Sequence, residues 1–542
     1  MVATDLILLW GSNAREAHPI FFHHVLRGMR AGARLAVVDP RRSQTAAHAD
    51  LWLGIDVGTD IALANAMGRE IIRAGLAHRP FIERATEGFE TYEAAVEPYT
   101  LERAEAITGV PAEDIRALAH AYARAERAQL CWTLGITEHH NAVDNVLALI
   151  NLALLTGHVG RPGSGLNPLR GQNNVQGGGD MGAIPNRLPG FQDIERDEPA
   201  RRRFERAWGR AIAPQSGWHL SQMFDAMERG DLRALYVIGE NPAQSEADVH
   251  RARRLLEALD HLVVQDMFLT RTATLADVVL PATASFCEAE GTVTSSERRV
   301  QRVRRAVEPP DGARDDLDIL SLLAARLGHP WGMPKAEAVW DELRRLSPMH
   351  GGMSYARLEA LHGLQWPCPD ETHPGTPVLH ERLWREPVEG PRAPFSPVAY
   401  DPPLDALSEA FPIRLTTGRR LDSFNTGVQS GVLQSPLRHG ERLELAPEDM
   451  RALGLADGER VRVVSRRGAL EVEVAASREG TLRPGLAFMT FHFPDETDTN
   501  LLTLDTWDPK SGTAEFKATA IRVERLDGRT APRGAREEVA SG

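Results

Sequence analysis

The chain opens by alternating apolar runs with turns and a helix, and this alternation constrains its fold more than any other feature. Residues 6–10 are continuously apolar and end in the turn Gly11-Ser12-Asn13, and a helix over about 19–29 leads to a second apolar run at 34–38. Further helices are expected over 61–72, from about 112 to 127 and over 144–155, with a strand at 129–134. The pattern predicts a parallel sheet covered by helices. In such sheets ligands bind beyond the carboxyl ends of the strands, and Asp39 directly follows the second run.

A second α/β unit is expected after a charged insertion at about 193–217. Continuous apolar runs at 234–238 and 262–264 predict strands that each end in a polar turn, and residues 277–281 repeat the pattern. Polar strand ends suit a nucleotide-shaped ligand, but any doubly wound domain has them, so both interpretations stay open.

The carboxyl-terminal part has a different pattern. Residues 366–411 are rich in proline, which indicates a linker or an extended segment that crosses the surface. Beyond them Val461 and Val463 alternate with polar residues before a turn at 466–468, and the alternation resumes at Val472 and Val474, which predicts a hairpin in a mostly β domain. The expected organisation is an α/β lobe at 1–170, a second at 171–365, a linker at 366–411, a β domain at 412–527 and a flexible tail at 528–542.

The amino-acid composition argues against several kinds of binding partner and site. The formal net charge of −13 argues against a broad nucleic-acid surface. No apolar run approaches the roughly 20 residues that cross a bilayer, so membrane insertion is not expected. The three cysteines, Cys131, Cys287 and Cys368, are too few for a four-cysteine iron–sulfur cluster within this chain. These features predict a cytoplasmic protein in a reducing compartment.

Residues 167–182 set one cation beside a run of amides and glycines. Glycine reaches positive φ cheaply, so Gly171 and the glycines at 177–179 could turn backbone N–H groups toward a phosphate or a metal oxo group. Arg170 offers a planar fork that matches a carboxylate. A structural glycine-rich turn with a solvated arginine is the alternative interpretation of the local pattern.

The sequence of this loop resembles that of the active-site loop of formate dehydrogenase alpha subunits, within the molybdopterin oxidoreductase superfamily. The resemblance runs from about Asp5 to Glu524. It is carried by separated motifs in one order: Leu9-Trp10-Gly11-Ser12-Asn13-Ala14, Val38-Asp39-Pro40-Arg41, Gly239-Glu240-Asn241-Pro242, Asp277 to Pro281 with Glu290-Gly291-Thr292, Leu415-Thr416-Thr417-Gly418-Arg419 and Asp508-Pro509-Lys510-Ser511-Gly512-Thr513.

The resemblance implies two doubly wound α/β lobes, a carboxyl-terminal double-psi β barrel of six strands and a bis(molybdopterin guanine dinucleotide) cofactor with molybdenum, tungsten being the alternative metal. It assigns to one dinucleotide Gly11, Ser12, Asn13, Asp39, Arg41 and Asp60, with Gly171 also at the cofactor. It assigns Gly239, Asn241, Gln265 and Asp266 to the other dinucleotide, and it places at the pterins Thr417, Gly418, Arg419, Asn500 and Lys517. Carboxylates suit the N–H edge of guanine, and backbone amides and cations suit a pyrophosphate.

By the same resemblance Arg170 is the catalytic arginine that holds formate, and Gln172 shapes its pocket, for a two-electron oxidation to carbon dioxide. The family's metal-ligating cysteine or selenocysteine and its iron–sulfur domain lie upstream of Asp5 in the aligned pattern, so no metal ligand is assigned here. An electron-transfer or iron–sulfur subunit or domain is therefore the expected partner, with the missing segment absent or on another chain. Two alternatives stay open: a cofactor-binding scaffold without turnover, and a sibling enzyme that acts on nitrate.

The histidines carry weaker signals. The adjacent pairs at 23–24 and 139–140 lack the spacing of metal ligands, so helix and loop positions are expected for them. His18, near the first turn, is a weaker candidate for the cofactor's surroundings than Arg170.

Overall fold

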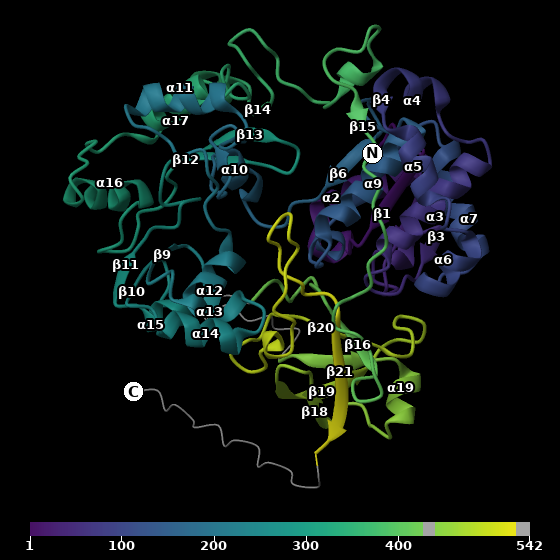
Figure 1. Cartoon of the computed structure of the whole chain (residues 1–542). Coiled ribbons are helices and arrows are strands. Elements are labelled where there is room, and N and C mark those ends of the chain that lie inside the picture. Colours follow the sequence, from purple (N-terminus) through teal and green to yellow (C-terminus); the bar gives the residue numbers. More distant parts are fainter. Residues whose placement is uncertain (427–439, 527–542) are drawn as a thin grey trace.

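Two α/β lobes lie side by side above a closed β barrel in the computed structural model of the chain (Figure 1). The structure describes residues 1–426 and 440–526. The tail expected at 528–542 lies outside these ranges.

The first lobe contains a parallel five-stranded sheet in the order β3-β2-β1-β5-β6, which confirms the predicted parallel sheet. Its strands are β1 (Leu6–Trp10), β2 (Arg34–Val38), β3 (Leu51–Leu53), β5 (Ala128–Trp132) and β6 (Gly165–Pro168). Its helices are α1 (Ala14–Ala17), α2 (Pro19–Arg30), η1 (Ala46–His48), α3 (Asp60–Arg73), α4 (Arg79–Ala85), α5 (Phe89–Val96), α6 (Leu101–Thr108), α7 (Ala112–Arg124), α8 (Leu134–Thr137) and α9 (Ala142–Thr156).

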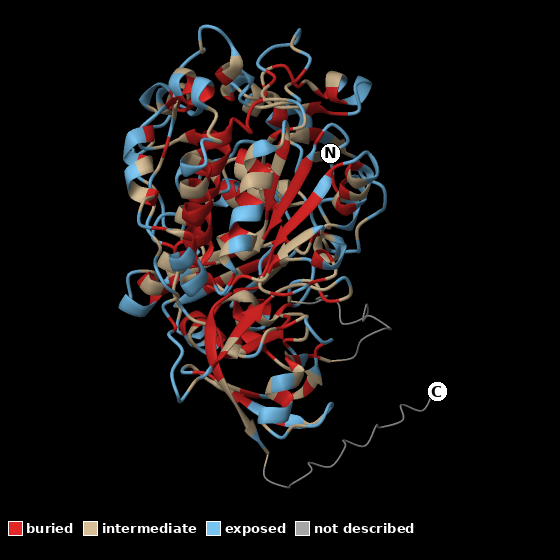
Figure 2. Ribbon diagram, turned by 90° about the vertical axis from the view of Figure 1, so that its right-hand side faces the viewer, coloured by how far each residue is buried: buried red, intermediate tan, exposed pale blue. Residues whose placement is uncertain are grey.

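Strand β1 is buried on both faces, which explains its continuous apolar run. Leu8 and Trp10 pack in a large core on one face of the sheet, and Ile7 and Leu9 pack in a smaller core on the other. The helices around the sheet bury one side and expose the other (Figure 2). Two predicted boundaries were too generous: α7 ends before 127 because β5 begins at 128, and β5 ends at Trp132 because α8 begins two residues later.

The second lobe combines a parallel sheet with an antiparallel one. The parallel strands β9 (Ala234–Ile238), β10 (His261–Asp266) and β11 (Val278–Pro281) confirm the three predicted strands. With them lie α12 (Leu220–Arg229), α13 (Pro242–Ser245), α14 (Val249–Glu257), α15 (Arg271–Leu275) and α16 (Asp316–Arg326). The antiparallel sheet of β12 (Gly291–Thr294), β13 (Arg299–Val303) and β14 (Leu364–Gln365) was not predicted. Near it in Figure 1 lie α10 (Val175–Asp180), α11 (Glu198–Trp208) and α17 (Ala336–Leu346), and this part of the chain also contains β7 (Arg187–Leu188), β8 (Gln192–Asp193) and α18 (Tyr355–Ala360).

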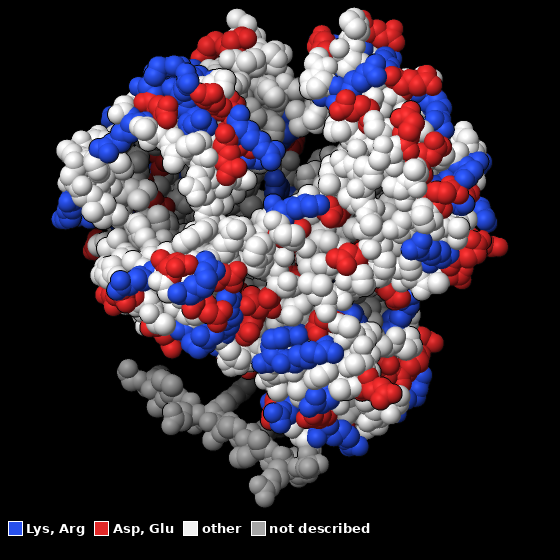
Figure 3. Space-filling model, viewed as in Figure 1, with Lys and Arg blue, Asp and Glu red and all other residues white. Residues whose placement is uncertain are grey.

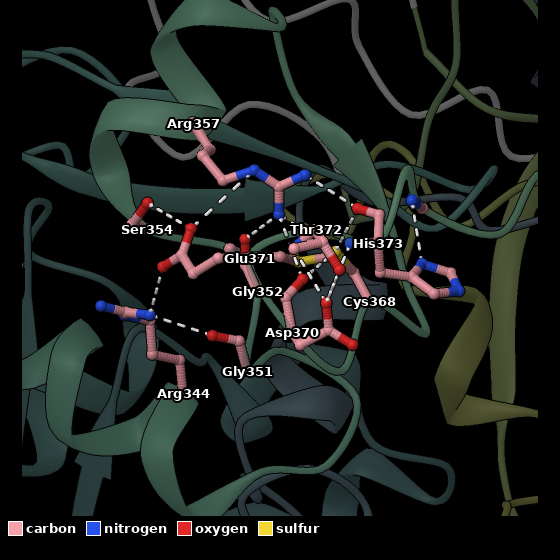
Figure 4. A network of polar contacts seen from close by, with 12 residues as sticks. Arg344, Gly351, Gly352, Ser354, Arg357, Cys368, Asp370, Glu371, Thr372 and His373 are labelled. Carbon is pink, nitrogen blue, oxygen red and sulfur yellow. Dashed lines mark hydrogen bonds and ion pairs between the residues drawn. The ribbon is translucent and has the colours of Figure 1, made fainter.

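A polar network fixes the start of the proline-rich segment to the second lobe (Figure 4). The Arg357 guanidinium donates to the carbonyl of His373 at 2.8 Å and to that of Asp370 at 3.3 Å. The Glu371 carboxylate accepts from Arg344 at 3.0 Å. Side chains therefore anchor this segment where it has little regular secondary structure.

The rest of this segment crosses the first lobe rather than hanging free. It contains η2 (Glu381–Trp384) and β15 (Ala393–Pro394), and β15 pairs with β4 (Thr86–Glu87) of the first lobe. Phe395 is buried and stacks on Tyr92 with ring centroids 5.0 Å apart. Of the two interpretations of 366–411, the structure matches the extended segment that crosses the surface.

The carboxyl-terminal domain is a closed barrel in the order β16-β20-β17-β19-β18-β21, which confirms the expected six-stranded barrel. Its elements are β16 (Ile413–Thr417), β17 (Arg442–Leu445), α19 (Pro447–Ala452), β18 (Arg460–Val464), β19 (Ala469–Ala476), β20 (Leu486–Met489), η3 (Thr499–Leu501) and β21 (Thr519–Arg525). The predicted hairpin is confirmed: Val461 pairs with Val472 in the antiparallel register of β18 and β19, and both point into the barrel core. Within the described residues, every helix is too short or too polar to cross a membrane.

Candidate active site

A cavity of about 750 Å³ lies where the two lobes and the barrel meet. In the space-filling view the molecule is hollowed between the two upper lobes, and acidic and basic side chains are interspersed over the visible face (Figure 3). The residues assigned from the family resemblance converge on this cavity, and all of them except Ser12 and Arg170 line it: Gly11, Asn13, Asp39, Arg41, Asp60, Gly171, Gln172, Gly239, Asn241, Gln265, Asp266, Thr417, Gly418, Arg419, Asn500 and Lys517.

The first lobe contributes the carboxyl edge of its sheet. The chain leaves β1 and β5 in neighbouring turns, and these turns touch: a Cβ on Gly135 would lie 2.6 Å from the Cα and carbonyl oxygen of Gly11. Gly11 has φ +57°, a conformation that glycine adopts at little cost. Ser12 is fully buried, and its Oγ has no hydrogen-bond partner within the described ranges. This edge is where open α/β sheets bind ligands.

Two buried carboxylates face the cavity from this lobe. Asp60 Oδ1 accepts a hydrogen bond from Trp10 Nε1 at 2.8 Å, and Asp39 Oδ1 accepts one from the backbone N–H of Arg41 at 2.9 Å. Burial raises the pKa of both carboxyls; Arg41 opposes the shift at Asp39, and His139 and Trp10 oppose it at Asp60. Both side chains keep oxygen atoms that can accept from N–H donors of a ligand.

The second lobe presents a connected set of amides. Gly239 has φ +63°, and Asn241 Oδ1 accepts from the backbone N–H of Thr272 at 3.0 Å. Gln265 accepts from the hydroxyl of Tyr236 and donates through Nε2 to Asp316 Oδ1 at 2.5 Å. Contacts with other side chains therefore fix the orientation of the Gln265 amide.

Asp316 lines the cavity but was missed by the sequence reasoning. It is the first residue of α16, and Asp315 caps that helix by accepting from the backbone N–H of Leu317. Paired acids before an apolar helix are a recognisable helix start, so the helix could have been found. Its position beside Gln265 depends on the tertiary fold.

The barrel closes the cavity with cations. Lys517 Nζ lies 2.6 Å from Glu138 Oε2 of the first lobe and donates to the carbonyl of Thr417 at 3.2 Å. The guanidinium of Arg41 stacks 3.5 Å from the ring centroid of Phe488, on β20. Positive charge therefore reaches the cavity from both the barrel and the first lobe.

Arg170 follows β6 and is exposed beside the cavity rather than in its lining. Its Nε donates to Gln176 Oε1 at 3.0 Å, and its carbonyl oxygen lies 2.8 Å from His18 Nε2. Gln176 in turn donates to Asp180 at 2.8 Å. Among the described residues, no hydrogen bond or ion pair involves the two terminal NH2 groups of Arg170.

The glycines at 177–179 do not face the cavity as expected. They lie in helix α10, where the N–H of Gly178 donates to the carbonyl of Asn174 at 2.9 Å. The N–H of Gly178 is therefore used within the helix, and the cavity lining does not include residues 177–179, so the structure does not support the predicted role of these N–H groups at a ligand. Gly171 does line the cavity, where a Cβ would lie 2.7 Å from a terminal nitrogen of Arg419.

Three titratable side chains of the first lobe also line the cavity: His18, which the sequence offered as a weaker candidate, and Glu138 and His139, which it did not place there. Burial lowers the pKa of His18, with a smaller effect of Arg419, against the opposing contact with the Arg170 carbonyl. A neutral His18 therefore donates through Nε2 to Arg170, while its Nδ1 is buried without a partner in the described residues.

The cysteines do not gather at the cavity. Cys131 and Cys368 are fully buried, and burial raises the pKa of the Cys131 thiol to about 12, so it stays protonated at neutral pH. Over residues 1–426 and 440–526, no group of three or more His, Cys, Asp or Glu side chains is arranged to hold a metal ion.

Comparisons with known proteins agree with this architecture. Residues 2–326 match the molybdopterin oxidoreductase family, and residues 413–520 match the molybdopterin dinucleotide binding domain. The chain is 40% identical over 526 residues to the F420-dependent formate dehydrogenase subunit alpha of Methanocaldococcus jannaschii, which covers 96% of this chain and 76% of that protein. It is 37% identical over 531 residues to formate dehydrogenase H of Escherichia coli, which covers 96% of this chain and 73% of that protein.

A solved structure shares the fold at low sequence identity. The acetylene hydratase from Pelobacter acetylenicus superposes with a TM-score of 0.74 and 19% identity over 97% of this chain and 78% of that chain. Together with the family match over more than half of the sequence, the three-part architecture and its shared cavity place the chain in the molybdopterin oxidoreductase family.

Proposed function

We propose that this chain is the catalytic alpha subunit of a formate dehydrogenase and contributes to the two-electron oxidation of formate to carbon dioxide and a proton. The observation that carries the proposal is the cavity, where both sheets' carboxyl edges and the barrel converge in a chain with 37–40% identity to formate dehydrogenase subunits. The match to acetylene hydratase supports the fold alone.

The donor set of the cavity fits a bis(molybdopterin guanine dinucleotide) cofactor. Such a group carries anionic phosphates and N–H-rich guanine and pterin edges. The cavity offers carboxylates for those edges, at Asp39, Asp60 and Asp316, and cations for the phosphates. Nδ1 of His18 and Oγ of Ser12, which have no hydrogen-bond partner among the described residues, are further polar atoms whose partners a ligand could supply.

We assign one dinucleotide to the first lobe, through the β1 turn at 11–13 with Asp39, Arg41 and Asp60. The other is assigned to the second lobe, through Gly239, Asn241, Gln265 and Asp266. We assign the pterins to the barrel side, through the turn at 417–419 with Asn500 and Lys517, and to Gly171 of the loop after β6. The corresponding domain boundaries are 1–170, 171–365, 366–411 and 412–527, of which residues 427–439 and 527 lie outside the described structure.

When bound, the molybdenum or tungsten of this cofactor accepts the two electrons released from formate. Arg170 is assigned to the formate carboxylate, because its Nε is held by Gln176 and its terminal NH2 groups can form a two-point contact. Gln172 shapes the same pocket from the cavity wall. His18 holds the Arg170 backbone at 2.8 Å and so positions the loop. Orientation and charge stabilisation of this kind are usually large contributions to catalysis.

The electrons released require an acceptor. We propose an electron-transfer or iron–sulfur subunit or domain as the partner, because the three cysteines of this sequence cannot supply a four-cysteine cluster. We further propose a cytoplasmic location, consistent with two fully buried, unpaired cysteines.

The test is metal and pterin analysis of the 542-residue chain produced with a host's molybdenum cofactor machinery, followed by dye reduction on the same sample. We expect bound molybdenum with guanine dinucleotide, and dye reduction that depends on formate. Faster turnover of nitrate than of formate would overturn the substrate assignment. Bound cofactor without any turnover would restrict the function to cofactor binding, and absence of cofactor would contradict the proposal.

A further inference from the structure

Glu515 lies between two adjacent histidines where the barrel domain meets the first lobe. Its Oε2 lies 3.4 Å from His139 Nδ1 and 3.6 Å from His140 Nδ1, and it accepts the backbone N–H of His140 at 3.0 Å. Its Oε1 accepts the backbone N–H groups of Lys517 at 2.8 Å and Ala518 at 3.0 Å. The carboxylate is therefore buried, held in one orientation and close to two imidazoles.

The surroundings of His139 match only the doubly protonated ring. Its Nε2 lies 3.1 Å from the carbonyl oxygen of Gly135, and its Nδ1 faces the Glu515 carboxylate. Both neighbours are acceptors, whereas a neutral imidazole has only one N–H. Either neutral tautomer would place a lone pair against an oxygen, so the imidazolium is the form that satisfies both contacts.

On balance, the charged groups around His139 also favour its protonated ring. Burial disfavours the cation, but Glu515 from the barrel domain and Asp60 from α3 raise the pKa of His139 above its ordinary value, against the smaller opposing effect of Lys517. Lys517 is itself paired with Glu138. Burial alone would raise the pKa of Glu515, but the two histidines and its backbone donors lower it well below its ordinary range.

His140 provides a contrast within the same cluster. Its Nε2 lies 3.0 Å from the carboxylate of Asp401, whose side chain is 59% exposed. The His140 ring is therefore paired with a carboxylate on the solvent side of the cluster. His139 lines the cavity, whereas His140 does not. The cluster therefore presents the positive end of its inner ion pair to the cavity.

We propose that His139 is a permanent imidazolium in the wall of the cofactor cavity, held in that state by Glu515 as a positioning residue. The positive charge of His139 stabilises the bound anionic molybdopterin cofactor. It stabilises the reduced cofactor more than the oxidised one, because a nearby cation interacts more strongly with the more negative state. The proposal rests on membership of the molybdopterin oxidoreductase family and stands whether or not formate is the substrate.

The first experiment measures the charge of the ring in the cofactor-free chain. Histidine is labelled with 13C at Cε1, the His139 resonance is assigned by its loss in His139→Gln, and the pH is varied from 5.5 to about 9, around the ordinary histidine pKa of about 6.5. We expect His139 to stay in the imidazolium position at pH 7.5 in the parent protein and to be neutral there in Glu515→Gln. A neutral His139 in the parent protein at pH 7.5 would overturn the proposal, whatever the result for Glu515→Gln.

The second experiment measures the midpoint potential of the molybdenum centre in cofactor-loaded protein. His139→Gln should lower the potential, because the reduced state loses a stabilising cation. His140→Gln is the matched control: it removes the other imidazole from the same carboxylate but leaves the cavity wall intact, and it should not shift the potential. Equal shifts in both variants, or no shift in His139→Gln, would refute a specific charge at the cavity. Because neither readout depends on turnover, failure of the formate assignment would leave this inference separately testable.

Discussion

Lys517 and Glu138 form a buried ion pair, with Nζ 2.6 Å from Oε2, across the boundary between the barrel domain and the first lobe. Their side chains are only 8% and 16% exposed. Lys517 and Glu138 Oε2 are close enough for an ion pair, but Lys517 is not aligned to donate a hydrogen bond to this oxygen. Nearby, Lys510 pairs with Asp144, and the backbone N–H of Phe516 donates to the carbonyl of Glu138 at 3.3 Å. The segment before β21 is thus bound to α8 and α9 beside the cofactor cavity.

Removing one partner of this pair should destabilise the cofactor-free protein. Glu138→Gln leaves the Lys517 ammonium buried and without its opposite charge, a change that costs about 3 kcal/mol in comparable sites. Scanning calorimetry should show a lower midpoint for the transition that includes the barrel. The double variant Glu138→Gln, Lys517→Met should lose less stability than the two single variants combined, and strict additivity would show that the pair has no mutual stabilisation.

The assignment of Arg170 to formate predicts a specific loss of substrate use. Arg170→Lys keeps a positive charge but not the planar fork, so we expect kcat/KM for formate to fall by about 100-fold with cofactor content unchanged. Steady-state kinetics on metal-quantified protein measure the effect. Arg196→Lys is the matched control, since Arg196 is exposed and outside the cavity lining. Equal kinetics in the two variants would remove Arg170 from the site, and loss of cofactor in the first would make it a structural arginine.

The parts of the fold that the sequence predicts well are those with local signals. The apolar run Leu6–Trp10 with its turn, and the alternation of Val461 and Val463, each identify an element directly, because burial on one or two faces leaves a repeating pattern. The antiparallel sheet leaves no such pattern. Its strand Leu364–Gln365 has two residues and pairs with a strand about 65 positions earlier, so only the tertiary fold defines it.

The same distinction holds within the site. Residues at strand ends, such as Asp39 and Asp266, are predictable because a parallel sheet brings its carboxyl ends to one edge. His139 was expected to be an ordinary loop residue, since its relation to the cavity depends on Glu515, 376 positions later in the sequence numbering. Contacts between domains of this kind are set by packing and carry no local sequence signal.

A buried histidine away from the cavity should make the protein sensitive to acid. His158 donates through Nε2 to the carbonyl of Tyr122 at 2.9 Å, and burial lowers its pKa to about 4. Between pH 6.5 and 4 the unfolded chain binds this proton and the folded chain does not, so stability is present above pH 6.5 and is lost as the pH falls. The difference of about 2.5 pKa units corresponds to roughly 3 kcal/mol at pH 4.

The variant His158→Gln tests this contribution, because its amide can still donate to Tyr122 but cannot be protonated in this range. Denaturant unfolding of the cofactor-free protein between pH 7.5 and 4.5 should show a shallower loss of stability in the variant than in the parent. Parallel curves would mean that His158 does not set the acid sensitivity. The exposed His23 supplies a control, since His23→Gln should leave the pH dependence of the parent intact.

The contact between Gly11 and Gly135 predicts which glycines cofactor binding requires. Gly11→Ala would place a Cβ 2.8 Å from the Gly135 carbonyl carbon and would also strain a residue at φ +57°, so the turns after β1 and β5 must move apart beneath the cavity. Gly178→Ala is the matched control, because a Cβ there would meet no atom of the described residues within 4 Å. The residue also lies in helix α10, where alanine is favoured by about 1 kcal/mol. Pterin and metal analysis of the purified variants should find cofactor lost from Gly11→Ala and retained in Gly178→Ala. Full cofactor content in Gly11→Ala would show that the β1 turn does not hold the dinucleotide, and loss from Gly178→Ala would return the glycine-rich stretch to the binding site.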